Sequence, residues 1–288
     1  MRLGVAPHRL WPAHEDELDG VLETARAAEE WGFDHLIASS HLLAGEVGVT
    51  PDPLVLLSAV AGATTRIRLV TSVLILPLYQ PVVVAHQTAT LDRLSGGRFT
   101  LGVGTGWDTA EFAAAGVPFS GRGRRADEQL EAVRKLWRDE AEVRLGVRPR
   151  TPGGPPVWVG GHSDAALRRA LRYGDAWHGS GLDAAGVAEV RGRLAELGEK
   201  AGRDPAKVLE LTEGLMLVPP GFEAAVQPPG RRPLGGAHPT AERVREELGR
   251  LAEAGLTACS LWLPVATEAL PDAIGWVAEE ILPAFSGG

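Results

Sequence analysis

The segment Arg98-Phe99-Thr100-Leu101-Gly102-Val103-Gly104-Thr105-Gly106-Trp107 is an apolar strand that runs into closely spaced glycines and then into a large aromatic residue. Glycine lets the backbone approach a ligand closely and turn through positive φ, so the segment predicts a strand end that holds a flat or phosphorylated cofactor. It is not the dinucleotide-binding motif G-x-G-x-x-G, because Trp107 stands where the third glycine would be. Crowded strands and turns also carry alternate glycines, and the remaining sequence has to distinguish the two interpretations.

Strand-like runs alternate with helical patterns along almost the whole chain, which is typical of repeated βα units. Eight units in 288 residues predict a single α/β domain, residues 1–288, folded as a (β/α)8 TIM barrel, with an open doubly wound sheet as the alternative. The expected strands are Arg2–Ala6, Phe33–Ala38, Ile67–Leu74, Arg98–Gly102, Pro156–Gly160, Asp175–His178, Val208–Leu217 and Thr257–Leu263. The expected helices include Glu15–Trp31, Pro81–Leu94, Asp127–Trp137, Asp164–Tyr173, Ala184–Ala201 and Ala241–Ala254.

Two insertions interrupt this regularity, one after strand four (Glu140–Pro155) and one after strand seven (Pro219–Pro239). Loops of this length are usually lids, oligomer contacts or poorly ordered segments. The second insertion follows the carboxyl end of a strand, and we therefore expect it at the active-site face of the barrel.

Composition excludes several classes of function. A formal net charge of −8 argues against general binding of nucleic acid or of an anionic membrane. The single cysteine, Cys259, excludes an intrachain disulfide and multi-cysteine metal sites, and its apolar neighbours predict an inert buried thiol. The first residues lack a secretory apolar region and no run reaches about 18 apolar residues, so we expect a cytoplasmic protein.

Histidines stand at the predicted carboxyl ends of four strands, which a barrel would gather at one mouth. They are His8, His41, His162 and His178. A zinc site from three of them is conceivable, but H-x-H and H-E-x-x-H pairs are absent and we expect no metal. The G-x-S-x-G elbow of serine hydrolases is absent as well.

The turn Gly160-Gly161-His162-Ser163 precedes a predicted helix, so its free amides and hydroxyl could bind a phosphate. The alternative is an ordinary glycine turn in which Ser163 or Asp164 caps the helix.

The chain resembles the luciferase-like monooxygenase superfamily, and within it the branch of oxidoreductases that use coenzyme F420, a 5-deazaflavin. Members of the superfamily use either F420 or FMN. The resemblance extends over almost the whole chain and is carried by Ser40-His41, Thr71–Leu74, Asp92–Trp107, Gly116–Phe119, Pro156–Gly161 and Arg172–His178.

This resemblance implies roles for particular positions. A non-proline cis peptide between Ser72 and Val73 would press on one face of the cofactor ring. His41 would stand near the reactive carbon and deliver a proton. The residues implied to bind the cofactor are Ser40, Thr71, Ser72, Val73, Gly104, Thr105, Gly106 and Trp107 around the ring, with Gly160, Gly161, His162 and Ser163 at the tail phosphate.

Two positions depart from the F420-dependent sugar dehydrogenase pattern, because Ser40 replaces an aspartate and Trp107 replaces a glutamate. These changes make sugar-phosphate oxidation doubtful. Glu111 could supply the missing acid as a second catalytic residue, or it could be a plain carboxylate in the first turn of a helix. The basic run Gly121–Arg125 could contact an anionic tail or a partner subunit, or form a solvated face paired with Asp127 and Glu128.

Taken together, the resemblance implies an enzyme, an oxidoreductase that transfers a hydride between F420 and a small organic substrate. Aromatic and apolar residues near strand ends suggest that the substrate is hydrophobic: Trp11, Leu76, Tyr79, Trp107 and Trp177. The alternatives are an FMN-dependent luciferase-like monooxygenase and a flavin- or deazaflavin-binding protein without turnover. The family often forms homodimers, and a homodimer is expected here.

Overall fold

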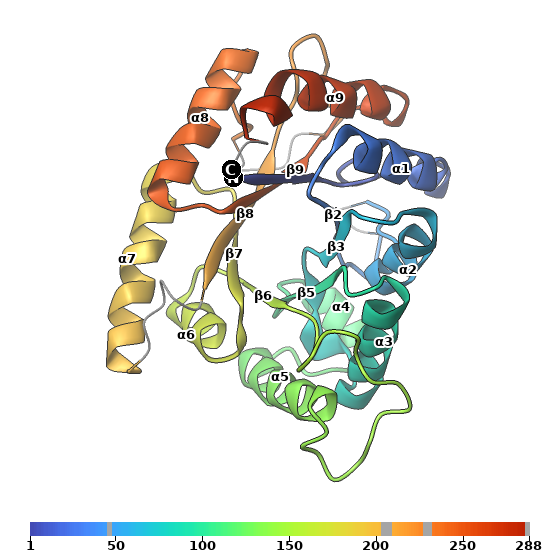
Figure 1. Ribbon diagram of the computed structural model, residues 1–288, viewed down its shortest axis with the longest axis vertical. Helices are drawn as coiled ribbons and strands as arrows, with labels where there is room; N and C mark the ends of the chain where they lie inside the picture. The colour runs from blue at the N-terminus through green and yellow to red at the C-terminus, as the bar shows by residue number, and fades with distance from the viewer. Residues whose placement is uncertain (45–47, 203–208, 227–231, 286–288) are drawn as a thin grey trace.

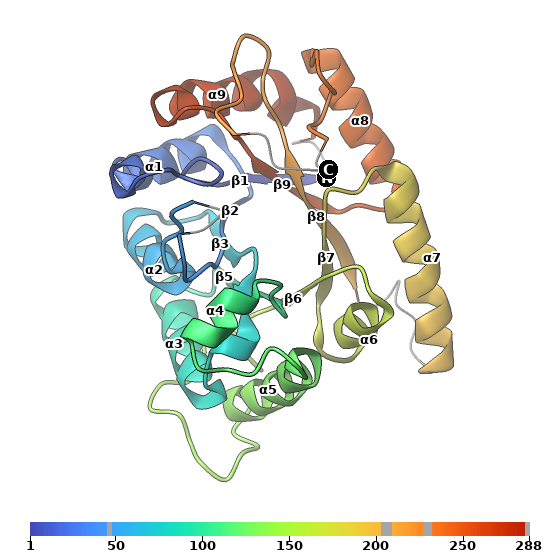
Figure 2. The ribbon, with the colours of Figure 1, turned by 180° about the vertical axis from the view of Figure 1, so that it is seen from behind.

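The computed structural model describes residues 1–44, 48–202, 209–226 and 232–285. Its strands form a closed ring of parallel strands with helices packed around the outside (Figure 1, and from behind in Figure 2). Neighbouring strands follow the order β3-β2-β1-β9-β8-β7-β6-β5-β4, and pairing of β3 with β5 closes the ring. The predicted (β/α)8 barrel is confirmed.

The third predicted strand is split into two short strands, β3 and β4, which both pair with β5. Val208, at the start of the predicted seventh strand, lies outside the described residues. The strands are β1 (Arg2–Val5), β2 (His35–Ala38), β3 (Arg68–Thr71), β4 (Leu74–Ile75), β5 (Phe99–Gly104), β6 (Val157–Gly160), β7 (Ala176–Ser180), β8 (Glu210–Met216) and β9 (Ala258–Trp262). The helices are α1 (Val21–Trp31), α2 (Pro53–Ala63), α3 (Pro81–Leu94), α4 (Thr109–Ala114), α5 (Arg122–Trp137), α6 (Asp164–Tyr173), α7 (Ala184–Lys200), α8 (Ala241–Ala254) and α9 (Leu270–Trp276).

Two predicted helix starts are wrong. The helix expected from Glu15 is a short 3-10 turn followed by α1, because Gly20 adopts φ 76° and interrupts it. Helix α5 begins at Arg122, so the basic run that we expected before the helix lies within its first turn. Helix α2 was not predicted, since it is apolar on nearly every side and shows no helical periodicity.

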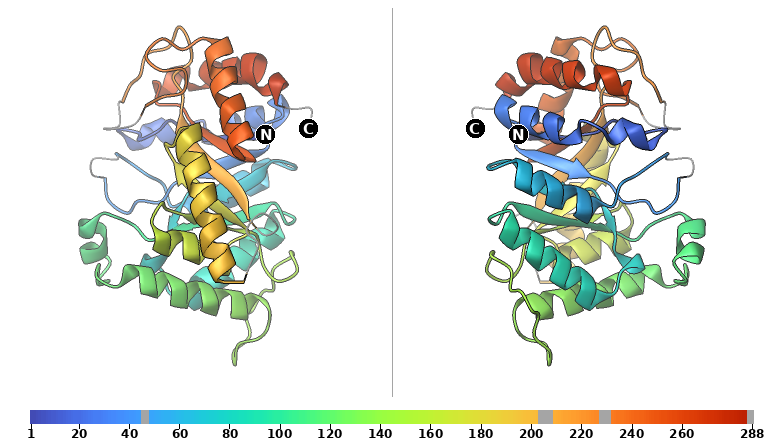
Figure 3. Two further views of the ribbon diagram at one scale, coloured as in Figure 1. Left: turned by 90° about the vertical axis from the view of Figure 1, so that its left-hand side faces the viewer. Right: turned by 90° about the vertical axis from the view of Figure 1, so that its right-hand side faces the viewer.

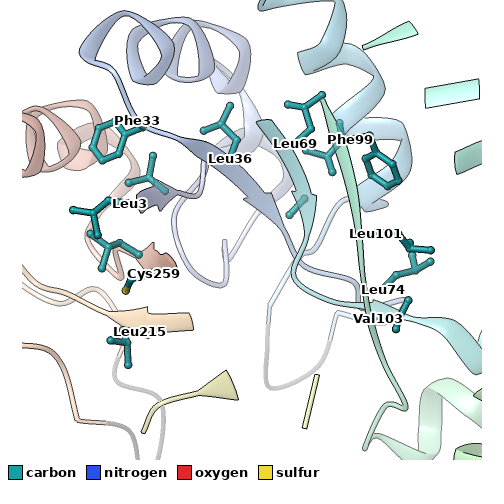
Figure 4. Close-up of a cluster of buried hydrophobic side chains, with 14 of the residues drawn as sticks. Leu3, Phe33, Leu36, Leu69, Leu74, Phe99, Leu101, Val103, Leu215 and Cys259 are labelled. Atoms are coloured by element: carbon teal, nitrogen blue, oxygen red, sulfur yellow. The ribbon is translucent and has the colours of Figure 1, made fainter. Parts of the chain in front are cut away.

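The core has two layers. Outward-facing residues of the strands pack beneath the surrounding helices, as Leu3, Leu36 and Leu69 illustrate, and Phe33, just before β2, joins them (Figure 4). A smaller cluster fills the inside of the barrel: Ala6, Leu10, Ile37, Val70, Trp158, Ala176, Met216, Ala258 and Trp262.

The two insertions differ in position. Figure 3 shows α4, which follows β5, and the long loop after α5 at opposite ends of the molecule. The buried carboxylate of Asp92 in α3 holds that loop, accepting hydrogen bonds from the Thr151 amide (2.8 Å) and hydroxyl (2.9 Å). The insertion after β8 lies at the carboxyl ends of the strands, where the Leu234 amide donates to the carbonyl of Met216, the last residue of β8 (2.8 Å). Within the described residues, none of the helices combines the length and apolar character needed to span a membrane.

Candidate active site

A cavity of about 870 Å³ opens at the carboxyl ends of the strands. This volume falls in the range of about 300–1,000 Å³ that small-molecule and cofactor sites occupy. Its lining comes from strand ends and the loops that follow them: Leu10, Trp11, Ser39, Ser40, His41, Ser72, Val73, Ile75, Gly104, Thr105, Gly106, Trp107, Gly160, Gly161, His162, His178, Gly179, Ser180, Gly214, Met216, Val226 and Trp262.

A bulge between β3 and β4 forms one part of this lining. The peptide bond between Ser72 and Val73 is cis, as predicted. The Val73 side chain fills space that two glycines leave open: an added Cβ would lie 2.6 Å from it at Gly104 and 3.3 Å at Gly160. Both glycines therefore serve the packing of the bulge, and both also present bare backbone to the cavity.

The loop after β5 is held in place by side chains that pack against it. Gly106 has φ 74°, and an added Cβ would lie 2.6 Å from Ile75. Its carbonyl accepts a hydrogen bond from Arg122 Nε (3.0 Å), whose guanidinium lies 3.8 Å from the centre of the Phe119 ring. The next residue, Trp107, is 58% exposed at the cavity mouth. Its position is thus set by a backbone that has little freedom to move.

A histidine and a carboxylate meet beside Trp107. His41 Nδ1 lies 3.2 Å from Glu111 Oε1, and the same oxygen accepts a hydrogen bond from the Leu42 amide (2.5 Å). Glu111 is 1% exposed, and its Oε2 finds no hydrogen-bond partner in the described part of the chain. The Trp107 ring packs edge-on against His41 at 5.7 Å. Glu111 therefore fixes the orientation of an imidazole that lines the cavity.

The turn after β6 exposes amides at the start of α6. Trp177 Nε1 donates to the Gly161 carbonyl (2.8 Å), which holds the turn at φ 120°. Ser163 is the N-cap of α6, and its hydroxyl accepts from the amide three residues on (3.3 Å). His162 Nε2 accepts from the Ser180 amide (3.2 Å), which leaves Nδ1 to donate. Such a turn suits an anionic group.

Another histidine, His178, lies buried in the middle of β7. Burial lowers its pKa to about 3, so the ring is neutral at physiological pH. Its Nε2 lies 2.9 Å from Ser72 Oγ and its Nδ1 2.8 Å from Thr212 Oγ1. The ring stacks on Trp158, with centres 5.4 Å apart.

Among the described residues, no group of three or more His, Cys, Asp or Glu side chains is placed to hold a metal ion. The histidines considered for zinc have other partners, and His8 Nδ1 donates to the Arg9 carbonyl (2.9 Å). Cys259 is fully buried, and burial raises the pKa of its thiol well above the usual range, so the thiolate does not form at neutral pH.

The profile of the luciferase-like monooxygenase family matches residues 3–258. The chain belongs to this family. Within it, 4-hydroxyprotoasukamycin monooxygenase from Streptomyces nodosus subsp. asukaensis is 34% identical over 168 residues, covering 54% of this chain and 45% of that enzyme. The FMNH(2)-dependent dimethylsulfone monooxygenase of Pseudomonas fluorescens is 28% identical over 183 residues, covering 59% of this chain and 50% of that enzyme. The luciferase-like chain spans about half the length of the curated relatives it matches.

Solved structures of low sequence identity share the fold over the whole luciferase-like chain. The monooxygenase RslO1 from Streptomyces bottropensis superposes with a TM-score of 0.80 and 22% identity, covering 99% of this chain and 100% of that chain. An F420-dependent secondary alcohol dehydrogenase superposes with a TM-score of 0.78 and 19% identity, covering 98% of each chain. The proteins that this chain resembles thus include one named for F420, which shares its fold, and one named for FMNH(2), which shares part of its sequence.

The cavity of this luciferase-like protein brings together most of the predicted site residues, but three of them do not line it. Thr71 is fully buried and its hydroxyl donates to the Gly102 carbonyl (2.7 Å). Ser163 caps α6, and Glu111 stands behind His41. Three of the residues expected at an apolar mouth are also absent from the lining: Leu76, Tyr79 and Trp177.

The sequence interpretation missed several lining residues. Met216 and Trp262 end β8 and β9, so the rule that located the other strand ends would have found them. Val226 belongs to the insertion after β8 and had no sequence signal beyond that loop. The basic run does not line the cavity: Arg124 pairs with Glu128 at 3.7 Å, and Arg125 donates to the Pro118 carbonyl (2.9 Å).

Proposed function

We propose that the protein transfers a hydride between coenzyme F420 and a small organic substrate. The observation that carries this proposal is the pairing of His41 with the buried carboxylate of Glu111 at the edge of a large cavity. His41 lines the same cavity as the cis bulge, and an imidazole there could transfer the proton that accompanies a hydride. The names of similar proteins, which mention F420 and FMNH(2), support a flavin-like ring as the hydride carrier.

The residues present fit a flavin-like cofactor. Gly104 and Gly106 line the cavity with backbone alone, because Val73, Ile75 and Phe112 fill the space that a Cβ would take. A flat ring can approach such a backbone closely. The amides at the start of α6 would hold the tail phosphate at the edge of the cavity, where Gly161 and His162 line it, and Ser163 would contribute by capping the helix. When bound, a deazaflavin supplies hydride transfer at carbon 5 of its ring and reacts poorly with oxygen.

His41 supplies the proton that accompanies hydride transfer. Because a carboxylate can only accept, Nδ1 carries the proton that it shares with Glu111, and Nε2 is the nitrogen that can exchange a proton with substrate. In the reducing direction the substrate gains a hydride and the Nε2 proton across one double bond. In the oxidising direction Nε2 takes the proton back. Trp107 packs against the ring and limits its rotation.

We further propose that the substrate is uncharged and apolar. No Asp, Glu, Lys or Arg side chain stands among the described residues that line the cavity, whereas Leu10, Trp11, Met216 and Trp262 do. A buried charge without a partner costs several kcal/mol, so a charged group of the substrate would have to remain at the mouth.

An FMN-dependent monooxygenase is the second candidate, and the printed name of the dimethylsulfone relative favours it. Titration of the purified protein with F420 and with FMN separately, followed by fluorescence, distinguishes the two. We expect F420 to bind more tightly. Tight binding of FMN without binding of F420 would support the monooxygenase. Binding of F420 without hydride exchange over a broad substrate panel would support a cofactor-binding protein without turnover.

We also propose a homodimer that forms through α2 and α3. Adjacent exposed positions on these helices carry no charge: Val55, Ser58, Ala59, Gly62, Val82, Val83, His86 and Gln87. Val55 is 71% exposed on a helix whose one polar side chain is Ser58, which is costly for a monomer. Light scattering after gel filtration should give a dimer for the wild type and a monomer for Val55→Glu/Val83→Glu. Val143→Glu, on the loop after α5, is the control that should leave the dimer intact.

A further inference from the structure

A chain of hydrogen bonds leads from the barrel interior to the cavity. The Thr212 hydroxyl donates to the Trp177 carbonyl (3.0 Å), and His178 Nδ1 lies 2.8 Å from the same hydroxyl oxygen. On its other side, His178 Nε2 lies 2.9 Å from Ser72 Oγ. Thr212 is fully buried, His178 is 5% exposed, and Ser72 and His178 line the cavity.

The direction of each bond in this chain follows from the number of protons available. A hydroxyl has one proton, and that of Thr212 is given to a carbonyl that cannot return one. His178 Nδ1 must therefore donate to Thr212, and a neutral ring then has a lone pair on Nε2. Ser72 must use its own proton to reach that lone pair. Its remaining hydrogen-bonding capacity, toward the cavity, is to accept.

We propose that His178 fixes Ser72 as a hydrogen-bond acceptor, and that Ser72 recognises an N–H group on the ring of the bound ligand. The ligand's identity rests on the proposed function. The direction of the Ser72 hydrogen bonds, donating to His178 and accepting from the cavity, does not. His178 is a positioning residue here, because it acts on the ligand through Ser72. The neutral state of the ring is consistent with its burial and with the stacked Trp158.

A fixed acceptor separates ligands by the groups that they present. A ring N–H gains a hydrogen bond at Ser72, whereas a ring nitrogen with a lone pair meets a second lone pair and is disfavoured. Flavin and deazaflavin rings carry N–H groups in the oxidised form and additional ones after reduction. Ser72 therefore provides selection for ring form without a charged residue, in a cavity where the described lining has none.

The direction of the hydrogen bonds along Thr212, His178 and Ser72 can be tested without any cofactor. Long-range ¹H–¹⁵N correlation spectra of the ligand-free protein, with the His178 signals assigned from His178→Gln, report which nitrogen carries the proton. We expect the proton on Nδ1 at neutral pH. In Thr212→Val, which removes the acceptor in a nearly unchanged volume, we expect the proton to move to Nε2. Thr212→Ser keeps the hydroxyl and should keep the wild-type pattern.

Affinity then tests recognition of the ligand. The Kd is measured for F420 and for FMN, each oxidised and reduced. In Ser72→Ala the Kd of the ring form that presents an N–H to Ser72 should rise about three- to tenfold, the loss expected of one hydrogen bond, and the Kd of the other form should rise less. Thr212→Val should show a similar loss although Ser72 is intact and position 212 does not line the cavity. Thr212→Ser should bind as the wild type does. Circular dichroism and thermal unfolding confirm that each variant is folded.

The outcomes separate the two proposals. A proton on Nε2 of His178, or on both of its nitrogens, in the wild-type spectrum would overturn the acceptor role of Ser72, whatever the cofactor results. A wild-type protein that binds neither cofactor would overturn the proposed function and, with it, recognition of a cofactor ring. Unchanged affinities in both Ser72→Ala and Thr212→Val would overturn recognition while leaving the proposed function in place.

Discussion

The two ends of the barrel differ in the charged side chains that line their cavities. At the amino ends of the strands, ion pairs join Arg2 to Glu210, Arg68 to Asp34 and Arg134 to Asp175. A smaller cavity of about 410 Å³ at this end has charged walls. At the carboxyl ends, the described lining of the larger cavity has no Asp, Glu, Lys or Arg.

This contrast indicates that the amino end contributes mainly to stability and the carboxyl end mainly to the proposed chemistry. The charges of these three pairs are satisfied within the protein, so they leave little for a ligand. At the carboxyl end, the buried carboxylate of Glu111 is turned toward His41 rather than the solvent. Substitutions at the carboxyl end should therefore change activity more than stability, and those at the amino end should do the reverse.

The largest effect is expected from His41→Gln, which should lower kcat by about 100- to 10,000-fold, the usual contribution of a general acid or base. The Kd for the cofactor should change less than threefold, because the cofactor is held elsewhere. Steady-state kinetics and fluorescence titration measure the two quantities. His238→Gln, at an exposed position, is the control. Equal losses of turnover and affinity would contradict a proton-transfer role.

Gly104→Ala should weaken cofactor binding by at least tenfold and destabilise the protein by about 1–3 kcal/mol, the usual cost of overpacking. The new Cβ would collide with Val73, 2.6 Å away, and push the bulge into the cavity. The matched control is Gly192→Ala in α7, where nothing lies within 4 Å and alanine should be neutral or stabilising. Chemical denaturation and titration decide the matter, and a fully active, stable Gly104→Ala would show that the bulge can shift freely.

At the other end, Asp34→Asn should cost about 1 kcal/mol of stability at pH 7 with little effect on kcat. Burial raises the pKa of Asp34, but hydrogen bonds and charge from His35 and Arg68 outweigh it and lower the pKa to about 2. Because the folded pKa lies below the unfolded value of 3.8, this stabilisation is complete above about pH 4 and disappears as the pH falls toward 2.

Urea denaturation at several pH values tests the Asp34 prediction. The difference in unfolding free energy between wild type and Asp34→Asn should be constant from pH 7 to pH 5 and shrink below pH 4. A difference that persists at low pH would mean that the packing of Asp34, rather than its charge, stabilises the fold.

The smallest effect is expected from Arg124→Ala. Both partners of the Arg124–Glu128 pair are exposed, and such pairs contribute about 0–1 kcal/mol. Thermal unfolding and cofactor affinity should both match the wild type. A clear loss of cofactor affinity would instead support contact between the basic run and an anionic tail.

Strand ends were the most predictable part of the molecule. Alternation of short apolar runs with helices located every barrel strand, and the strand-end rule then placed Ser40, His41 and Gly160 at one cavity. The hydrophobic periodicity of the sequence did not predict helices that lack a polar stripe, nor breaks within a helical pattern. Helix α2 has one polar side chain, Ser58, and therefore no polar stripe, and the turn at Gly20 depends on a positive φ that the helical pattern of its neighbours concealed.

Contacts between distant side chains could not be predicted in the same way. In the sequence, Glu111 fits a catalytic acid and an ordinary helix-start carboxylate equally well, and only the folded chain brings it within 3.2 Å of His41. The link from Thr212 through His178 to Ser72 joins β8, β7 and the bulge between β3 and β4, and no local spacing encodes it.

The packing of Val73 against Gly104 and Gly160 has a consequence for how this site can vary. These three positions share one fixed volume, so a methyl group added to either glycine must be matched by one removed from the valine. Diversification at this end of the barrel should then proceed by paired exchanges that conserve volume, with either single exchange passing through a less stable intermediate sequence. A library that randomises the three positions together should recover folded variants that one-at-a-time mutagenesis discards.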